Sequence, residues 1–136
     1  MKRTFIISIL LLCFVGIFAQ SNPSKPPKYD GNPNARYQLY PTQNMWTFIK
    51  LDTQTGKMWQ VQFAINKPNE RYGYCINREE LLALSDTLVN GRFTLYPTEN
   101  MYNFILLDQI NGKAWQVQWS NDNNSTRGIV AEIKDY

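Results

Sequence analysis

Residues 36–63, RYQLYPTQNMWTFIKLDTQTGKMWQVQF, return without a gap as residues 92–119, RFTLYPTENMYNFILLDQINGKAWQVQW. The offset is 56 residues, and 17 of these 28 positions are identical. Identity at this level indicates an internal duplication. Arg71 and Arg127 keep the same offset, which extends the two units to residues 36–77 and 92–133. A duplication this even predicts a pseudo-twofold structure in which the two units pack like faces together.

Each unit carries the pattern of four β-strands. Apolar and polar residues alternate with period two, most clearly near the end of the repeat, where tryptophan and valine alternate with two glutamines. In the first unit the strands are expected at 36–40, 45–51, 59–63 and 72–76, and in the second unit at 92–96, 101–107, 115–119 and 129–133. Asp52 and Asp108 each open a turn that ends at a glycine, so we expect their side chains to cap those turns.

The fold class predicted from these elements is all-β. Eight antiparallel strands, from two tandem four-stranded repeats, would form either a barrel or a two-sheet sandwich. One short helix is expected between the units at 78–85, since Asn77 can cap it and Glu79, Glu80 and three leucines follow. One shared core is predicted from equivalent residues of both units: Leu39, Ile49, Trp59, Val61, Leu95, Ile105, Trp115 and Val117.

The N-terminus has the three-part pattern of a secretory signal peptide. Lys2 and Arg3 precede an almost continuous apolar run, and Ala19 offers a small residue for cleavage. We therefore expect a signal peptide at 1–19 and a proline-rich flexible tether at 20–35. The remaining residues, 36–136, are expected to form one β domain. This organisation predicts export to the periplasm, cell envelope or exterior, with no membrane attachment after cleavage.

Charge and composition exclude several function classes. Removal of the two basic residues of the signal peptide leaves 12 basic and 11 acidic side chains, and this near-neutral balance disfavours nucleic acid as a partner. The chain has no histidine, the commonest general base and metal ligand. Cys75 is the one cysteine beyond the signal peptide, and we expect it to be a buried, inert strand residue. No catalytic residue, metal ligand or cofactor site is predicted.

The chemistry that remains is aromatic and amide. Aromatic rings can stack on the apolar face of a sugar while nearby amides bond to its hydroxyls. The alternative is that the rings belong to the core and the glutamines to a solvated sheet face, since strands are rich in aromatic residues anyway. The candidate ligand-binding residues are Trp46, Tyr102, Tyr40, Tyr96, Gln60, Gln62, Gln116 and Gln118.

The paired motif Leu-Tyr-Pro-Thr-x-Asn-Met-x-x-Phe-Ile-x-Leu-Asp-x-x-x-Gly-Lys-x-Trp-Gln-Val-Gln spans residues 39–62 and 95–118. It resembles a motif of short secreted bacterial proteins of uncharacterised function. The resemblance covers both units, roughly half of the chain beyond the signal peptide. It implies a secreted or envelope setting, and it implies no activity and no site residues.

Three functions follow as hypotheses. The first is a non-catalytic module that binds a protein or a glycan at the cell envelope. The second is an inhibitor or immunity-type protein directed at an exported enzyme. The third, a small hydrolase working through carboxylates, is disfavoured because no cluster of polar residues accompanies the acidic ones.

Overall fold

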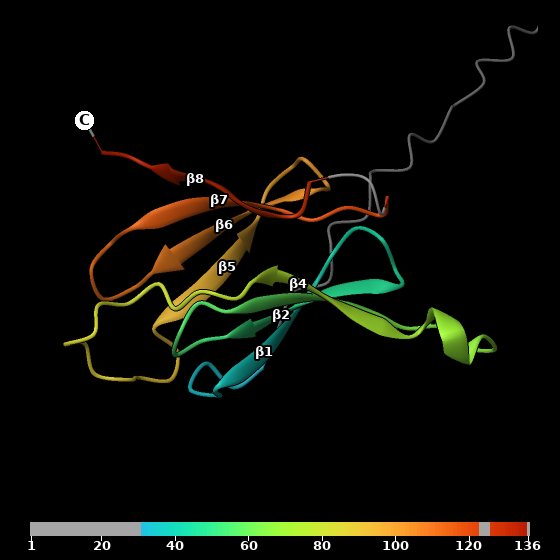
Figure 1. Cartoon of the computed structure of the whole chain (residues 1–136), viewed down its shortest axis with the longest axis horizontal. Helices are drawn as coiled ribbons and strands as arrows, with labels where there is room; N and C mark the ends of the chain where they lie inside the picture. The colour runs from blue at the N-terminus through green and yellow to red at the C-terminus, as the bar shows by residue number, and fades with distance from the viewer. Residues whose placement is uncertain (1–30, 123–125, 136) are drawn as a thin grey trace, which may run out of the picture.

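The structure is a computed structural model, and it describes residues 31–122 and 126–135. The predicted signal peptide and most of the predicted tether lie outside these residues. Figure 1 shows the fold of the described part, which consists of strands joined by turns and loops. The strands are β1 (Tyr37–Pro41), β2 (Thr47–Asp52), β3 (Met58–Gln62), β4 (Tyr72–Asn77), β5 (Phe93–Pro97), β6 (Asn103–Asp108), β7 (Ala114–Gln118) and β8 (Gly128–Ile133).

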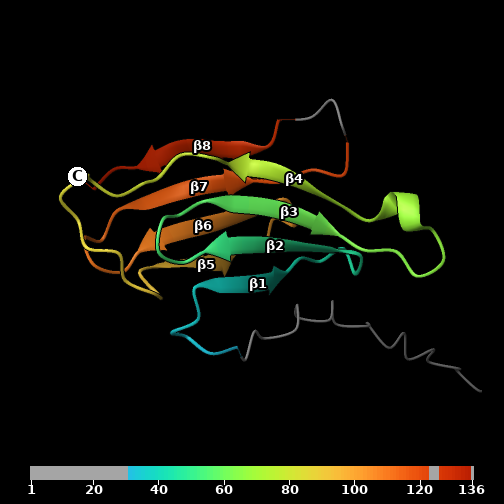
Figure 2. The same ribbon diagram turned by 60° about the horizontal axis from the view of Figure 1, so that its bottom comes forward.

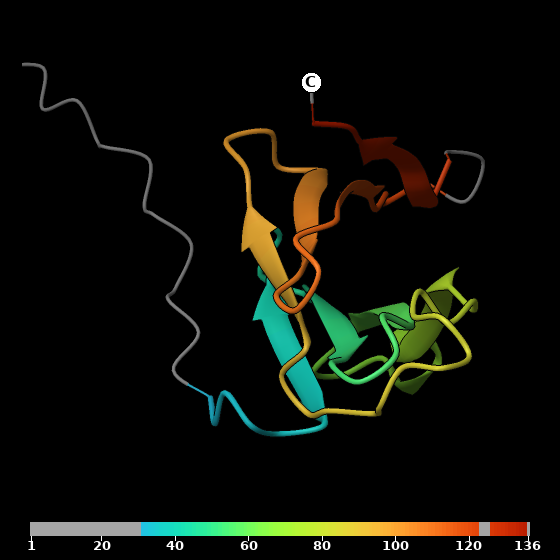
Figure 3. The ribbon, with the colours of Figure 1, turned by 90° about the vertical axis from the view of Figure 1, so that its left-hand side faces the viewer.

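The eight strands form two antiparallel sheets, one from each repeat. Strand order is β1-β2-β3-β4 in the first sheet and β5-β6-β7-β8 in the second, so every strand pairs with its neighbour in sequence. The sheets lie face to face, as Figures 2 and 3 show from two further directions. They approach each other where β4 meets β8 and where β2 meets β5. The predicted all-β fold is confirmed, and within the described residues it is the two-sheet sandwich and not the barrel.

The tight turns form for the reason the sequence suggests. The Asp52 carboxylate accepts a hydrogen bond from the backbone N–H of Gln54 at 3.1 Å, and Gly56 adopts a φ of 77°. In the second unit Asp108 accepts from the N–H of Ile110 at 2.9 Å. An aspartate that caps its own turn, followed by a residue with positive φ, is a low-energy way to reverse a strand. The two capping roles are confirmed.

The helix predicted at 78–85 is wrong. The segment has no regular secondary structure, and the one helical turn of the described residues is η1 (Pro68–Glu70), inside the first unit. The Asn77 side chain donates to the carbonyl of Gly56 and accepts from the N–H of Glu79, so it ties the segment to the β2–β3 turn. The N–H of Leu81 continues this contact by donating to Thr55 O at 2.9 Å. A helix of two turns is marginal on its own, and these tertiary contacts replace it.

The expectation that like faces pack together is also wrong. In each sheet we call the side that carries Trp59 or Trp115 the tryptophan face, and the side that carries Gln60 or Gln116 the glutamine face. The second sheet buries its tryptophan face, whereas the first sheet buries its glutamine face. The core is therefore built from unlike faces of the two repeats, listed here as first sheet and then second sheet: Gln38, Tyr40, Ile49, Leu51, Met58 and Gln60; Phe93, Leu95, Phe104, Leu106, Trp115 and Val117.

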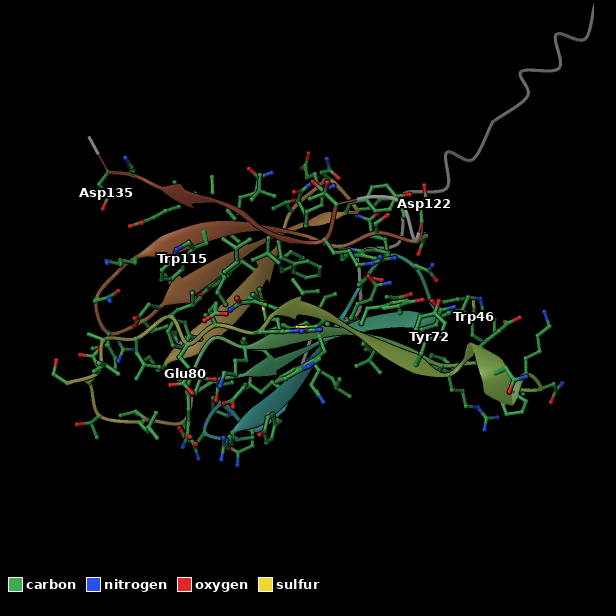
Figure 4. The ribbon with its side chains drawn as sticks, viewed as in Figure 1. Trp46, Tyr72, Glu80, Trp115, Asp122 and Asp135 are labelled. Atoms are coloured by element: carbon green, nitrogen blue, oxygen red, sulfur yellow. The ribbon has the colours of Figure 1, made fainter. Side chains whose placement is uncertain are left out.

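Half of the predicted core residues consequently lie elsewhere. Ile49, Leu95, Trp115 and Val117 are buried as expected, and Figure 4 shows Trp115 on the side of its sheet that faces the other sheet. Leu39 and Ile105 are exposed, and Trp59 and Val61 are only half-buried. Successive residues of a strand point to opposite sides of a sheet, so turning one unit over exchanges the buried set for the exposed set.

Candidate functional site

The tryptophan face of the first sheet lies on the outside of the sandwich. Leu39 is 46% exposed, whereas its repeat counterpart Leu95 is 3% exposed. The neighbouring rings and aliphatic groups are half-buried or exposed, which makes this an extended apolar surface without a cover among the described residues. Its residues, with the pairing of the strands that places them together, are Tyr37, Leu39, Phe48, Lys50, Trp59 and Val61.

Lys50 modifies this surface. Its ammonium group lies 4.5 Å from the centroid of the Trp59 ring, a cation–π contact between cross-strand neighbours. The repeat counterpart of Lys50 is Leu106, which is fully buried. The charged end of Lys50 thus covers part of the tryptophan ring on this face. The sequence pattern did not identify Lys50, although the lysine-for-leucine difference between the repeats is a signal that could have done so.

The glutamine face of the second sheet lies on the opposite outer side. Tyr96 is 50% exposed, against 6% for its counterpart Tyr40, and Ile105 is 37% exposed, against 0% for Ile49. Gln116 is exposed and its amide donates to Asn103 on the same face at 2.9 Å. The sandwich therefore presents two outer faces, and each is a copy of a face that the core buries.

The structure does not assemble the eight predicted ligand-binding residues into one site. Tyr40 and Gln60 lie in the core, and the Tyr40 hydroxyl donates to Gln38 Oε1 at 2.6 Å. Tyr96 and Gln116 lie on the outer glutamine face of the second sheet, and Gln62 and Gln118 are half-buried. The interpretation of the rings as core holds for Tyr40, and that of the glutamines as a solvated face holds for Gln116.

Trp46 and Tyr102, the two remaining candidates, lie at equivalent hairpin ends. The Trp46 ring packs on Phe63 with centroids 5.3 Å apart, and the Tyr102 ring packs on Trp119 at the same separation. In Figure 4 Trp46 is at the end of the first sheet, near Tyr72. Each ring is therefore held by the residue that follows the third strand of its unit. The two hairpins belong to different sheets, and each ring packs on a residue of its own unit.

A polar contact joins the two sheets within the core. The side-chain amide of Gln60 donates to the carbonyl of Ser120 at 2.9 Å, and its oxygen accepts from Arg127 Nε at 3.1 Å. Arg127 also donates to the Ser120 carbonyl through Nη2 at 3.0 Å. The Gln60 amide thus joins a hydrogen-bonded pair that consists of the Ser120 carbonyl and the Arg127 guanidinium. Both polar groups of the buried amide are satisfied, as burial requires.

The same pair exists in the first unit without an inserted glutamine. Arg71 donates through Nε to Ala64 O at 2.9 Å, and these residues are the counterparts of Arg127 and Ser120. Arg71 is exposed. The sequence pattern identified the match of Arg71 with Arg127 but did not identify its role.

The two aspartates that both repeats share, Asp52 and Asp108, have structural roles. Arg92 donates through Nε and Nη2 to one Asp108 oxygen at 2.9 and 2.8 Å, and both side chains are almost fully buried. Its Nη2 also donates to Asp86 at 2.8 Å. The hydrogen bond to Asp108 raises the pKa of Arg92 above its ordinary value, and the hydrogen bond from Arg92 lowers the pKa of Asp86. The first unit has the weaker version, a single contact of 3.2 Å from a half-exposed Arg36 to Asp52.

Other chemistry in the described residues is sparse. No group of three His, Cys, Asp or Glu side chains there is placed to hold a metal. A cleft between the β1–β2 and β5–β6 turns, lined by Pro41, Pro97 and their neighbours, has a volume of about 10 Å³, enough for one water molecule. Cys75 is half-buried and lies beside Trp59 on the outer tryptophan face, so the expectation of a buried cysteine is wrong.

No protein-family model, curated protein or solved structure matches the chain. Among residues 31–122 and 126–135, no helix has the length and apolar character needed to cross a membrane. The two outer faces, which copy the two faces of the buried interface, are the features of the described residues that bear on function.

Proposed function

We propose that this protein is an exported, non-catalytic interaction module, and that it binds a protein partner through the outer tryptophan face of its first sheet. The observation that carries the proposal is the contrast between the two repeats. Leu95, Phe104, Trp115 and Val117 are buried against a sheet, while the identical residues of the first unit face outward. Exposed apolar surface of this kind, rimmed by polar groups, is typical of protein interaction sites.

The shape of the surface favours a protein over a glycan or a small molecule. The eight aromatic and amide candidates are spread over the inner side of the first sheet, the outer glutamine face of the second sheet and two hairpin ends. The proposed binding surface lies on a four-stranded sheet, and the cleft between the two proline turns has room for only about one water molecule. Ligands of small size usually bind in deep concave pockets, and protein partners use broad faces.

The hydrogen bonding of the acidic residues supports a non-catalytic role. Asp52 and Asp108 cap turns and pair with arginines, so neither is available as a general base. The setting outside the cytoplasm rests on the N-terminal pattern alone. A mature N-terminus near residue 20, determined by mass spectrometry of the native protein, would support export. Recovery of the protein with an intact Met1 would contradict it.

The binding surface can be tested by photo-crosslinking in the native host. A photoreactive amino acid replaces Leu39 on the proposed surface, and in a matched control it replaces Ile110, an exposed apolar residue in the β6–β7 turn. The proposal predicts a defined crosslinked protein from position 39 and none from position 110. Equal labelling from both positions, or no crosslinked protein from position 39, would refute the proposed surface.

A further inference from the structure

We propose that the partner of the outer tryptophan face is a second copy of this chain, which contributes the outer glutamine face of its second sheet. The inference rests on the proposed function and names the partner. The result is a head-to-tail contact, because the two surfaces are different and lie on opposite sides of each molecule. Such contacts leave one free face at each end and can continue into longer assemblies.

The molecule already contains this interface once. The core joins a tryptophan face to a glutamine face, and each chain carries one further copy of each on its outside. The outer tryptophan face keeps Leu39, Phe48, Trp59 and Val61, identical to the buried residues of the second unit. The outer glutamine face likewise keeps three side chains that the first sheet buries, Tyr96, Ile105 and Gln116. Two surfaces that pack together within a chain are suited to pack together between chains.

Polar groups on the two outer faces also match, independently of the apolar residues. Inside the chain, the Gln60 amide bonds to both the Ser120 carbonyl and Arg127, which also bond to each other. Outside it, the counterpart of the glutamine, Gln116, is exposed on one face. The counterpart of the receiving pair lies in the first unit, where an exposed Arg71 donates to the carbonyl of a half-buried Ala64. A second copy that docks as the sheets do internally brings Gln116 to this pair and repeats the same hydrogen bonds.

The differences between the repeats make the contact between chains weaker than the one within the chain. Lys50 replaces the buried Leu106, and Tyr37 replaces Phe93, which adds polar groups to the outer tryptophan face. On the outer glutamine face the buried Met58 becomes Ala114. Both changes reduce the apolar contact that the two outer faces can make. We therefore expect reversible association that depends on protein concentration.

The decisive experiment uses two variants that each block one face. Leu39→Asp places a charge on the tryptophan face, and Ile105→Asp places one on the glutamine face; both positions are exposed, so folding should survive, which circular dichroism checks. In sedimentation velocity, each variant alone should remain monomeric, and an equimolar mixture should form a dimer and nothing larger. If Ile105→Asp alone still dimerises, the contact joins like faces and the proposal fails. If the mixture stays monomeric, the proposal also fails.

A variant that strengthens association complements the two blocking variants, because misfolding cannot account for tighter binding. Lys50→Leu restores the residue that the buried face uses, and it should lower the dissociation constant by roughly tenfold, which corresponds to about 1.4 kcal/mol. Ile110→Leu, an apolar exchange off both faces, is the control and should leave association unchanged. A native protein and a Lys50→Leu variant that are both monomeric at millimolar concentration would overturn the proposal.

The polar contact has its own test within the mixed dimer. Arg71→Ala is added to the Ile105→Asp chain and Gln116→Ala to the Leu39→Asp chain. Each change should weaken the dimer, and both together should weaken it no more than one alone, since they remove the same contact. Independent, additive losses would show that the two side chains do not meet. Crosslinking at position 39 separates the two proposals: a foreign protein there would retain the interaction module but refute the second copy, and a crosslink to the chain itself supports both.

Discussion

Equivalent residues of the two repeats should differ in their contribution to stability. At the leucine position the second unit should contribute more, and at the isoleucine position the first unit should. Leu95 is 3% exposed and Ile49 is 0% exposed, so truncation of either to alanine leaves a cavity in the core. Such changes cost about 2–5 kcal/mol. Leu39 and Ile105 occupy the same repeat positions but lie on outer faces, 46% and 37% exposed.

The cost for the outer pair can be worked from transfer energies. Leucine or isoleucine to alanine removes three carbons, worth about 0.8 kcal/mol each when fully buried. With nearly half of the side chain already in water, roughly half of that value remains, and solvent fills the space so that no cavity forms. Leu39→Ala and Ile105→Ala should therefore cost about 1 kcal/mol. Within each repeat pair the difference is about 1–4 kcal/mol, with the leucine costly in the second unit and the isoleucine in the first.

The assay is urea unfolding of the four variants, followed by tryptophan fluorescence at a protein concentration low enough to exclude association. Unfolding midpoints at an unchanged slope convert directly into free energies of unfolding. Ile110→Ala, at an exposed turn position, provides the control for a change off both faces. Large losses of stability for both leucine variants, with small losses for both isoleucine variants, would mean that the tryptophan faces of both sheets pack together. That pattern, or equal costs within each pair, would refute the arrangement of unlike faces.

Three further predictions concern the buried ion pair and the turns. Arg92→Ala should lower the free energy of unfolding by about 3–5 kcal/mol, because it leaves buried carboxylate charge without a partner; Arg36→Ala, which removes a half-exposed partner, should cost much less in the same urea assay. The pKa of Asp86 is lowered in the folded state, so its stabilising effect is present above the ordinary carboxyl value of 3.8 and is lost as the pH falls through the lower folded value. Asp86→Asn should flatten the dependence of stability on pH below about 4, and an unchanged acid limb would contradict this assignment. Gly56→Ala and Gly112→Ala both strain a turn with positive φ, but only the first forces a Cβ to within 2.8 Å of a leucine side chain, so its melting temperature should fall further.

Much of the fold could be read from the residues themselves. The duplication, the number of strands and the turns follow from local chemistry, since period-two alternation and aspartate-capped glycine turns act within a few residues. The short segment after β4 could not be read in this way. Asn77 and the acidic residues after it are suited to a helix start, but the same asparagine also fits the β2–β3 turn. Contacts with a turn twenty residues earlier in the chain decide between the two.

The face that each unit buries was determined only by the tertiary structure. Alternation identifies two sides of a strand, and in this repeat both sides carry apolar residues, so the pattern alone favours neither. The differences between the repeats do carry the information: Lys50 against Leu106 and Met58 against Ala114 place the larger apolar residue of each pair on the side that the sandwich buries. Their meaning emerges only when the two sheets are in contact, because burial depends on which surface the other unit covers.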